Sequence, residues 1–116
     1  MSLQRAKLAD IQYVASSAGS IYANPASTKT FVRGITLHNT NSTAETVKLY
    51  NVPDSATALG TAGAGNRFLN VSLAANDTLL IEMPYPIVLT DQNDSIQAET
   101  TTASKVTVQL HGDTDA

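Results

Sequence analysis

The sequence contains no cysteine and no tryptophan, and aromatic residues make up only 5% of its 116 residues. The absence of cysteine excludes disulfides, thiolate metal sites and cysteine nucleophiles. Uninterrupted apolar runs are also short, far below the roughly 20 residues that a transmembrane helix requires, so we expect no membrane partner. The first residues include no apolar stretch of the kind that forms a secretory signal. The length predicts a single domain.

Charged residues are scarce as well, at 15% of the chain, against about 25% in average globular proteins. Seven Lys and Arg oppose ten Asp and Glu, which gives a net charge of -3. Scattered basic residues on an acidic chain cannot neutralise a phosphate backbone, so we expect no nucleic-acid partner. Ser, Thr and Asn fill the places of the missing charges and predict a neutral, hydroxyl-rich surface.

Apolar and polar residues alternate along most of the chain, which is the period of half-buried strands. Clusters of turn residues interrupt this alternation every 8–12 residues or so, a spacing typical of antiparallel sandwiches and barrels. We therefore predict an all-β fold, a jelly-roll-like antiparallel β-sandwich of about eight short strands. The residues expected to face its core are Ile11, Tyr13, Ile35, Leu37, Val47, Leu49, Leu69, Val71, Leu73, Leu79, Ile81, Met83, Ile87, Leu89, Ile96, Val106, Val108 and Leu110.

The N-terminal segment departs from this pattern. Ser2 to Asp10 has a composition compatible with a short helix or a flexible arm, and Leu3 and Leu8 are poorly spaced for a single helical stripe. We divide the single domain into residues 1–19, an arm or short helix plus a first strand, and residues 20–116, the sandwich. If copies of the chain associate, the arm Ser2 to Asp10 is expected to reach a neighbouring copy.

Three further irregularities are expected within the sandwich. A bulge near Gly34 would turn Val32 inward in place of Phe31. A change of phase before Pro53 indicates a second twist or bulge, and the prolines of Pro84-Tyr85-Pro86 interrupt a ladder. Residues 53–66 (PDSATALGTAGAGN) form the longest loop, and the one expected to be most mobile.

Groups able to carry chemistry are few. His38 and His111 could bind a metal together only if their strands were neighbours, and exposed or interface histidines are the simpler interpretation. Thr90 to Ser95 opens like a calcium loop, but the glycine and glutamate that complete an EF-hand are missing, so a turn closed by Asx side chains explains it better. The glycines of GTAGAG (60–65) loosely resemble a phosphate-binding loop. No Lys-Ser or Lys-Thr pair follows them, and they lead into a strand and not a helix, so we expect no nucleotide-binding site there.

No nucleophile elbow and no distinguished pair of carboxylates occurs in the sequence. We therefore expect a protein that is not an enzyme, with no catalytic, cofactor-binding or metal-binding residues and no cofactor. A small enzyme or metal protein is the less favoured reading.

From Tyr22 onward the order of short motifs is YANPASTKT, VRGITLHNT, TVKLY, the Gly/Ala loop, FLNVSLAANDTL, PIVL, DSIQA and VTVQLHG. This order resembles small structural proteins of tailed-bacteriophage and prophage particles, encoded among head and tail genes. The resemblance implies a β-sandwich subunit of the virion with a head-decoration, neck or tail-associated place. It also implies a homo-oligomer, with three copies expected, and other virion proteins as partners. Gln92-Asn93-Asp94 departs from the more usual Gly-Asp turn, and the segment to Gly19 matches nothing in this pattern.

A carbohydrate- or receptor-binding module of a phage tail or surface protein is the alternative function. Such modules use β-sandwiches, and their sugar platforms normally expose Trp or Tyr. Trp is absent, and Tyr22, Tyr50 and Tyr85 are the tyrosines that the strand pattern does not assign to the core.

Overall fold

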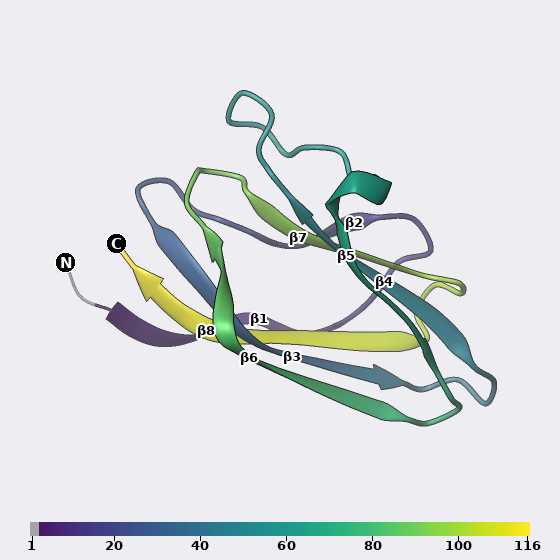
Figure 1. Cartoon of the computed structure of the whole chain (residues 1–116). Helices are drawn as coiled ribbons and strands as arrows, with labels where there is room; N and C mark the ends of the chain where they lie inside the picture. The colour runs from purple at the N-terminus through teal and green to yellow at the C-terminus, as the bar shows by residue number, and fades with distance from the viewer. Residues whose placement is uncertain (1–2) are drawn as a thin grey trace.

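The alternating segments form eight strands in the computed structural model, which describes residues 3–116 (Figure 1). Short turns and one single-turn 3-10 helix, η1 (Ala64–Asn66), connect them, and within the described chain no helix is long and apolar enough to cross a membrane. The strands are β1 (Leu3–Tyr13), β2 (Gly19–Ala23), β3 (Lys29–Asn39), β4 (Glu45–Val52), β5 (Arg67–Leu73), β6 (Thr78–Leu89), β7 (Ser95–Thr100) and β8 (Val106–Asp115).

The strands make two four-stranded antiparallel sheets, ordered β1-β8-β3-β6 and β2-β7-β4-β5. The chain can be followed as one long antiparallel two-stranded ribbon. Its successive strand pairs are β1·β8, β2·β7, β3·β6 and β4·β5, and they alternate between the two sheets. Added pairing of β3 with β8 and of β4 with β7 completes each sheet. This winding is that of a jelly roll, so the predicted all-β sandwich of eight strands is confirmed.

Aliphatic side chains from both sheets meet between them and form one core. Of the residues expected to face inward, ten are buried and six more are half-buried and pack against the core. The buried ones come mainly from the two central strands of each sheet, because these strands have a neighbour on both sides. The ten are Ile35, Leu37, Val47, Leu49, Leu73, Leu89, Ile96, Val106, Val108 and Leu110, and the six are Leu69, Val71, Leu79, Ile81, Met83 and Ile87.

The N-terminal segment corrects two expectations. The described part of the expected helix or arm is instead the edge strand β1, which pairs with β8; Ser2 lies outside the described residues. Ile11 and Tyr13, expected in the core, are 64% and 57% exposed, whereas Ala9 is buried. The physical reason is that the register of β1 against β8 shifts twice, between Lys7 and Ala9 and between Ala9 and Gln12, and each shift changes which side chains face inward.

The expected bulge near Gly34 is confirmed. Val32 pairs with Ile87 and Gly34 with Glu82, so residues 83–86 of β6, which include both prolines, are extra residues opposite Arg33. Val32 is fully buried and Phe31 is not. On the other flank, β3 approaches β8 so closely that a Cβ at Gly112 would collide with the carbonyl oxygen of Phe31. Only glycine therefore fits position 112.

The other two irregularities are also visible. Against β5, the register of β4 shifts between Leu49 and Tyr50, which leaves Phe68 as the extra residue of a bulge. The prolines at 84 and 86 interrupt pairing with β3, although β6 continues as one strand through them.

Candidate functional site

The two histidines lie on adjacent strands, as a metal pair would require, but at different heights. In the register of β3 against β8, His38 is opposite Thr107 and His111 is opposite Gly34. Four strand positions of about 3.3 Å each separate them, or roughly 13 Å. Nδ1 of His38 lies 2.8 Å from Oγ1 of Thr78 on β6. The fold therefore does not bring these imidazoles together on one ligand.

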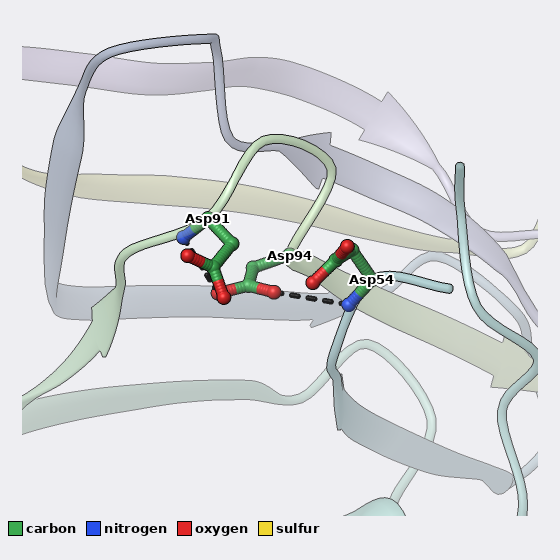
Figure 2. A group of neighbouring side chains, drawn as sticks. All are labelled: Asp54, Asp91 and Asp94. Carbon is green, nitrogen blue, oxygen red and sulfur yellow. Dashed lines mark hydrogen bonds between the residues drawn. The ribbon is translucent and has the colours of Figure 1, made fainter. Parts of the chain in front are cut away.

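The turn between β6 and β7 does bring carboxylates together. One oxygen from each of Asp54, Asp91 and Asp94 lies within 4.8 Å of the others, and Figure 2 shows the three side chains at the meeting of two loops. Of the three alternate positions that make residues 90–95 resemble the start of a calcium loop, Asp91, Asn93 and Ser95, only Asp91 belongs to this group. Asn93 donates instead to the carbonyl oxygen of Thr57 at 2.6 Å, and Ser95 is fully buried.

Asp94 is the centre of this turn. Its Oδ2 accepts hydrogen bonds from the backbone N–H groups of Thr90 (3.1 Å) and Asp91 (3.0 Å), and its Oδ1 accepts one from that of Asp54 (2.9 Å). Burial acts to raise the pKa of Asp94, but the amides of Asp91, Asp54 and Thr90 outweigh it and hold that pKa below its ordinary value. Both oxygens are thus used to fix two loops, as expected of an Asx-closed turn.

A buried asparagine completes this end of the sandwich. Asn24, at the end of β2, donates to the carbonyl oxygens of Thr28 (2.7 Å) and Asp91 (3.1 Å), and its own carbonyl accepts from the Thr30 hydroxyl (2.6 Å). Tyr22 hydrogen-bonds that same Thr30 hydroxyl at 3.0 Å. The β2–β3 and β6–β7 turns are therefore joined through one amide side chain.

The opposite end repeats this arrangement with Asn39 and Glu45. The amide of Asn39 donates to the carbonyl oxygens of Thr43 (3.0 Å), Leu73 (3.1 Å) and Ala74 (3.1 Å). Asn39 is fully buried and its hydrogen bond to Leu73 is buried with it, while the Ala74 oxygen also accepts the N–H of Asp77 at 3.1 Å.

Glu45 supplies the carboxylate at that end. It accepts from the N–H of Thr102 at 2.8 Å and from the amide of Asn41 at 3.0 Å. Burial acts to raise the pKa of Glu45, but the hydrogen bonds from Thr102 and Asn41, together with the charge of Lys105, leave it lowered. Asp94 lies in the turn that was expected to be closed by Asx side chains. Asn24, Asn39 and Glu45 were not predicted as closing residues, although an asparagine stands at the end of both β2 and β3.

The glycine-rich loop has a structural explanation. A Cβ at Gly60 would collide with the carbonyl oxygen of Pro53, and the amide of Gln97 donates to the carbonyl oxygen of Gly60 at 3.0 Å. The loop then passes through the three-residue η1 into β5. Gly60 therefore allows close packing on the end of β4, whereas nothing lies close enough to Gly63 or Gly65 to require glycine there.

The tyrosines differ sharply in exposure. Tyr50 is buried and donates its hydroxyl to Glu99, and this hydrogen bond, with burial, raises the pKa of Tyr50. Tyr22 is half-buried, as described above. Tyr85, between the two prolines of β6, is 91% exposed, and Tyr13 stands exposed on β1 at the far edge of the same sheet. Among Tyr22, Tyr50 and Tyr85, the candidate tyrosines for a sugar-binding platform, Tyr85 is therefore the one whose ring is almost fully exposed to solvent.

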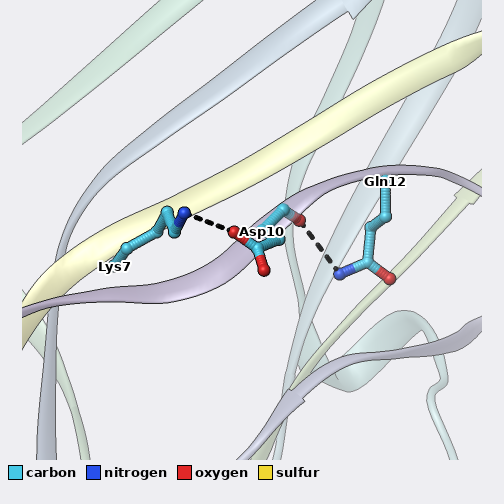
Figure 3. A network of polar contacts seen from close by, with 3 residues as sticks. All are labelled: Lys7, Asp10 and Gln12. Atoms are coloured by element: carbon cyan, nitrogen blue, oxygen red, sulfur yellow. Dashed lines mark hydrogen bonds and ion pairs between the residues drawn. The ribbon is translucent and has the colours of Figure 1, made fainter.

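The two ion pairs found in residues 3–116 both lie on strands of the β1-β8-β3-β6 sheet. Arg33 pairs with Asp113 across β3 and β8. On β1, Lys7 lies 2.5 Å from Asp10, and Gln12 donates to the backbone oxygen of Asp10 at 3.4 Å, so the three form a chain along the strand (Figure 3). In both pairs a basic side chain contacts an acidic one, and exposed pairs such as Lys7–Asp10 stabilise a fold only slightly.

Apolar exposure concentrates on the edges of the sheets. Edge strands β1, β5 and β6 carry seven of the eight large hydrophobic side chains that are exposed in residues 3–116. A groove of about 340 Å³ between β5 and β6 is lined mostly by apolar side chains, Phe68, Leu69, Ile81, Met83 and Ile87, with Asn51. The exposed edge residues are Leu3, Ile11, Tyr13, Phe68, Leu80, Tyr85 and Val88.

The arrangement as a whole defines a class of protein, an all-β antiparallel sandwich with jelly-roll winding. No protein-family model matches the sequence, and no curated protein matches it. Among solved structures, the chain is similar to a chain in "Structure of infectious bursal disease virus Gt strain", with 11% identity and a TM-score of 0.33. The match covers 97% of this chain and 32% of that one, so this chain spans about a third of its length.

Proposed function

We propose that this chain is a non-enzymatic structural subunit of a bacteriophage particle. It resides in the virion, where it forms a trimer and also contacts other virion proteins. It needs no cofactor, and neither nucleic acid nor membrane is among its partners. The order of motifs from Tyr22 to Gly112 supports the particle assignment, since it resembles that of small virion proteins.

One observation carries the proposal. In residues 3–116 the buried or half-buried polar groups Asn24, Asn39, Glu45 and Asp94 close the two ends of the sandwich, whereas apolar side chains stand exposed along its free edges. Exposed sheet edges are surfaces for pairing with another chain, and symmetric assembly covers them. These polar groups therefore stabilise the fold, and the exposed apolar side chains along the sheet edges favour association with another chain.

The direct test is detection in particles. An antibody against the recombinant chain is applied to purified phage particles from the host that encodes it, with immunogold labelling and quantitative mass spectrometry. The expected result is labelling at a defined place on the particle and a fixed copy number. Recovery of the chain only from the particle-free lysate would overturn the proposal.

The exposed ring of Tyr85 favours a second candidate, a carbohydrate- or receptor-binding module. Pro84 and Pro86 flank this ring, and an aromatic face that is 91% exposed can stack on a sugar. A glycan array probed with the wild-type chain and with Tyr85→Ala tests this function. Binding that the substitution abolishes would establish it, and an array without binding would remove it.

A further inference from the structure

The two sheets end in four edge strands, and three of these are disrupted. β1 changes register twice against β8, and β2 is only five residues long with a register shift of its own. β6 contains Pro84 and Pro86, which cannot donate to a ladder. Such short, bent or proline-containing edges resist pairing with another chain. Three of the four edges described in residues 3–116 therefore have this protection.

β5 is different. Between Leu69 and Leu73 it pairs with β4 in unbroken register, and no charge lies within these five residues. On its other side no strand of residues 3–116 is its neighbour. Leu69, Val71 and Leu73 face the core side, and the first two of them are only half-buried. Asn70 and Ser72 are exposed on the opposite face. An uncharged, regular edge with incompletely covered apolar residues favours the addition of a strand.

The polarity of this segment is the same in both directions: Leu69-Asn70-Val71-Ser72-Leu73 reads apolar, polar, apolar, polar, apolar from either end. If two copies of it pair antiparallel about Val71, Leu69 lies opposite Leu73, Val71 opposite Val71, and Asn70 opposite Ser72. Each apolar pair falls on the core face, and each polar pair falls on the outer face. A two-fold contact requires this self-complementarity, because the same patch serves both copies.

We propose that two copies of this chain associate through their β5 strands, antiparallel about Val71, so that the two β2-β7-β4-β5 sheets become one eight-stranded sheet. This contact rests on the proposed self-association of the subunit and specifies one of its interfaces. The groove beside Phe68 and Leu69 then lies next to Leu73 and Ala74 of the second copy, whose small and aliphatic side chains suit its apolar lining. The pairwise contact can coexist with a three-fold contact elsewhere in a closed assembly.

Two double variants at the same exposed positions test the contact. N70E/S72E places Glu opposite Glu at both polar pairs of the interface, whereas N70E/S72K places Glu opposite Lys at both. Within one chain, position 70 lies opposite Lys48 and position 72 opposite Thr46, so both variants are expected to fold. Circular dichroism and thermal melting check folding, and sedimentation over a range of concentrations gives the dimer dissociation constant.

The expected result is that the wild type and N70E/S72K dimerise, while the dissociation constant of N70E/S72E rises about tenfold. Three equal constants would overturn the β5 contact and leave self-association standing. A wild-type chain that remains monomeric at every concentration would overturn both proposals.

If N70E/S72E does not fold, amide hydrogen exchange on the wild type decides the question. Protection at Leu69–Leu73 should rise with protein concentration, because pairing covers the free N–H groups of the edge. Protection that does not depend on concentration would overturn the contact.

Discussion

Each end of the sandwich is closed by one asparagine and one carboxylate, but the two ends differ in which of these residues makes more hydrogen bonds to the backbone. At one end Asn24 donates to two backbone carbonyls, and Asp94 accepts from three backbone amides. At the other end Asn39 donates to three carbonyls, and Glu45 accepts from one backbone amide and one side-chain amide. The first end thus depends more on its carboxylate, and the second more on its asparagine.

Burial sharpens this contrast. Asn39 and Glu45 are both buried, whereas Asp94 is half-buried with Asp91 and Asp54 beside it. A carboxylate that stands among other carboxylates and still has a lowered pKa must receive strong compensation, which its backbone amides supply. A jelly roll needs both ends closed, because the turns there cross from one sheet to the other. At the Asn39 end this closure consists mainly of a side-chain amide that donates to backbone carbonyls. At the Asp94 end it consists mainly of a carboxylate that accepts from backbone N–H groups.

The largest effect is expected from Asn39→Ala. It removes a donor from the carbonyl oxygens of Thr43, Leu73 and Ala74, and a buried carbonyl left without a donor costs about 1–3 kcal/mol. The Leu73 hydrogen bond is the buried one, and the Ala74 oxygen keeps a second donor, the N–H of Asp77. With partial access of water, we expect a loss of about 2–4 kcal/mol in the free energy of unfolding, measured by urea denaturation. Asn24→Ala should cost less, because fewer carbonyls depend on it.

Gln4→Ala is the control for both substitutions. Gln4 is exposed on β1, away from both asparagines and from the proposed β5 contact, and its replacement should change the free energy of unfolding by no more than about 0.5 kcal/mol. If Asn24→Ala proved more costly than Asn39→Ala, the assignment of the asparagine role to the Asn39 end would be wrong.

The next effect concerns pH. The pKa values of Glu45 and Asp94 are both lowered from ordinary values of 4.5 and 3.8. Their contribution to stability is therefore complete above those ordinary values and is lost as the pH falls through the folded-state pKa. We expect the free energy of unfolding to fall in this acid range by an amount on the order of 1 kcal/mol for each group.

Denaturation as a function of pH in Asp94→Asn and Glu45→Gln measures the two contributions separately. Each variant should be less stable than the wild type near neutral pH and should lose less stability in acid. The flattening should be greater for Asp94→Asn, because Asp94 accepts more backbone hydrogen bonds. Acid profiles parallel to the wild type would show that these carboxylates do not stabilise the turns.

A smaller effect, of opposite sign, is expected from Asp91→Asn. Asp91 adds a like charge beside Asp94 and Asp54 at an exposed position, and removing it relieves repulsion. The free energy of unfolding should rise by about 0.2–0.5 kcal/mol at low salt, and the gain should shrink as salt screens the charges. A loss of stability would indicate instead that the Asp91 carboxylate holds a favourable contact.

The fold could be predicted from the sequence because aliphatic and polar residues alternate over long stretches of the central strands, despite the bulge in β3 and the change of phase in β4. Val106, Val108 and Leu110 could hardly be placed otherwise than on one face. β1 could not be predicted, since its bulges change its phase and its pairing with β8 overrides a weak local preference. The closures by Asn24, Asn39 and Glu45 were missed for a related reason: Asn39 and Leu73, for example, lie far apart in the sequence, and only the winding of the strands brings them together.

The smallest effect on stability is expected at Tyr85, and this makes it the sharpest probe of function. The ring is 91% exposed at the bulge of β6, outside both ends of the sandwich, so Tyr85→Ala should change the free energy of unfolding by no more than about 0.5 kcal/mol. Any loss of particle incorporation or of ligand binding in this variant would therefore report a lost contact and not a lost fold. Tyr22→Phe is the comparison at the closed end, where the hydroxyl bonds Thr30 and a measurable loss of stability is expected. If Tyr85→Ala unfolded more easily than Tyr22→Phe, the Pro84–Pro86 bulge would be part of the framework of the fold and not a free surface.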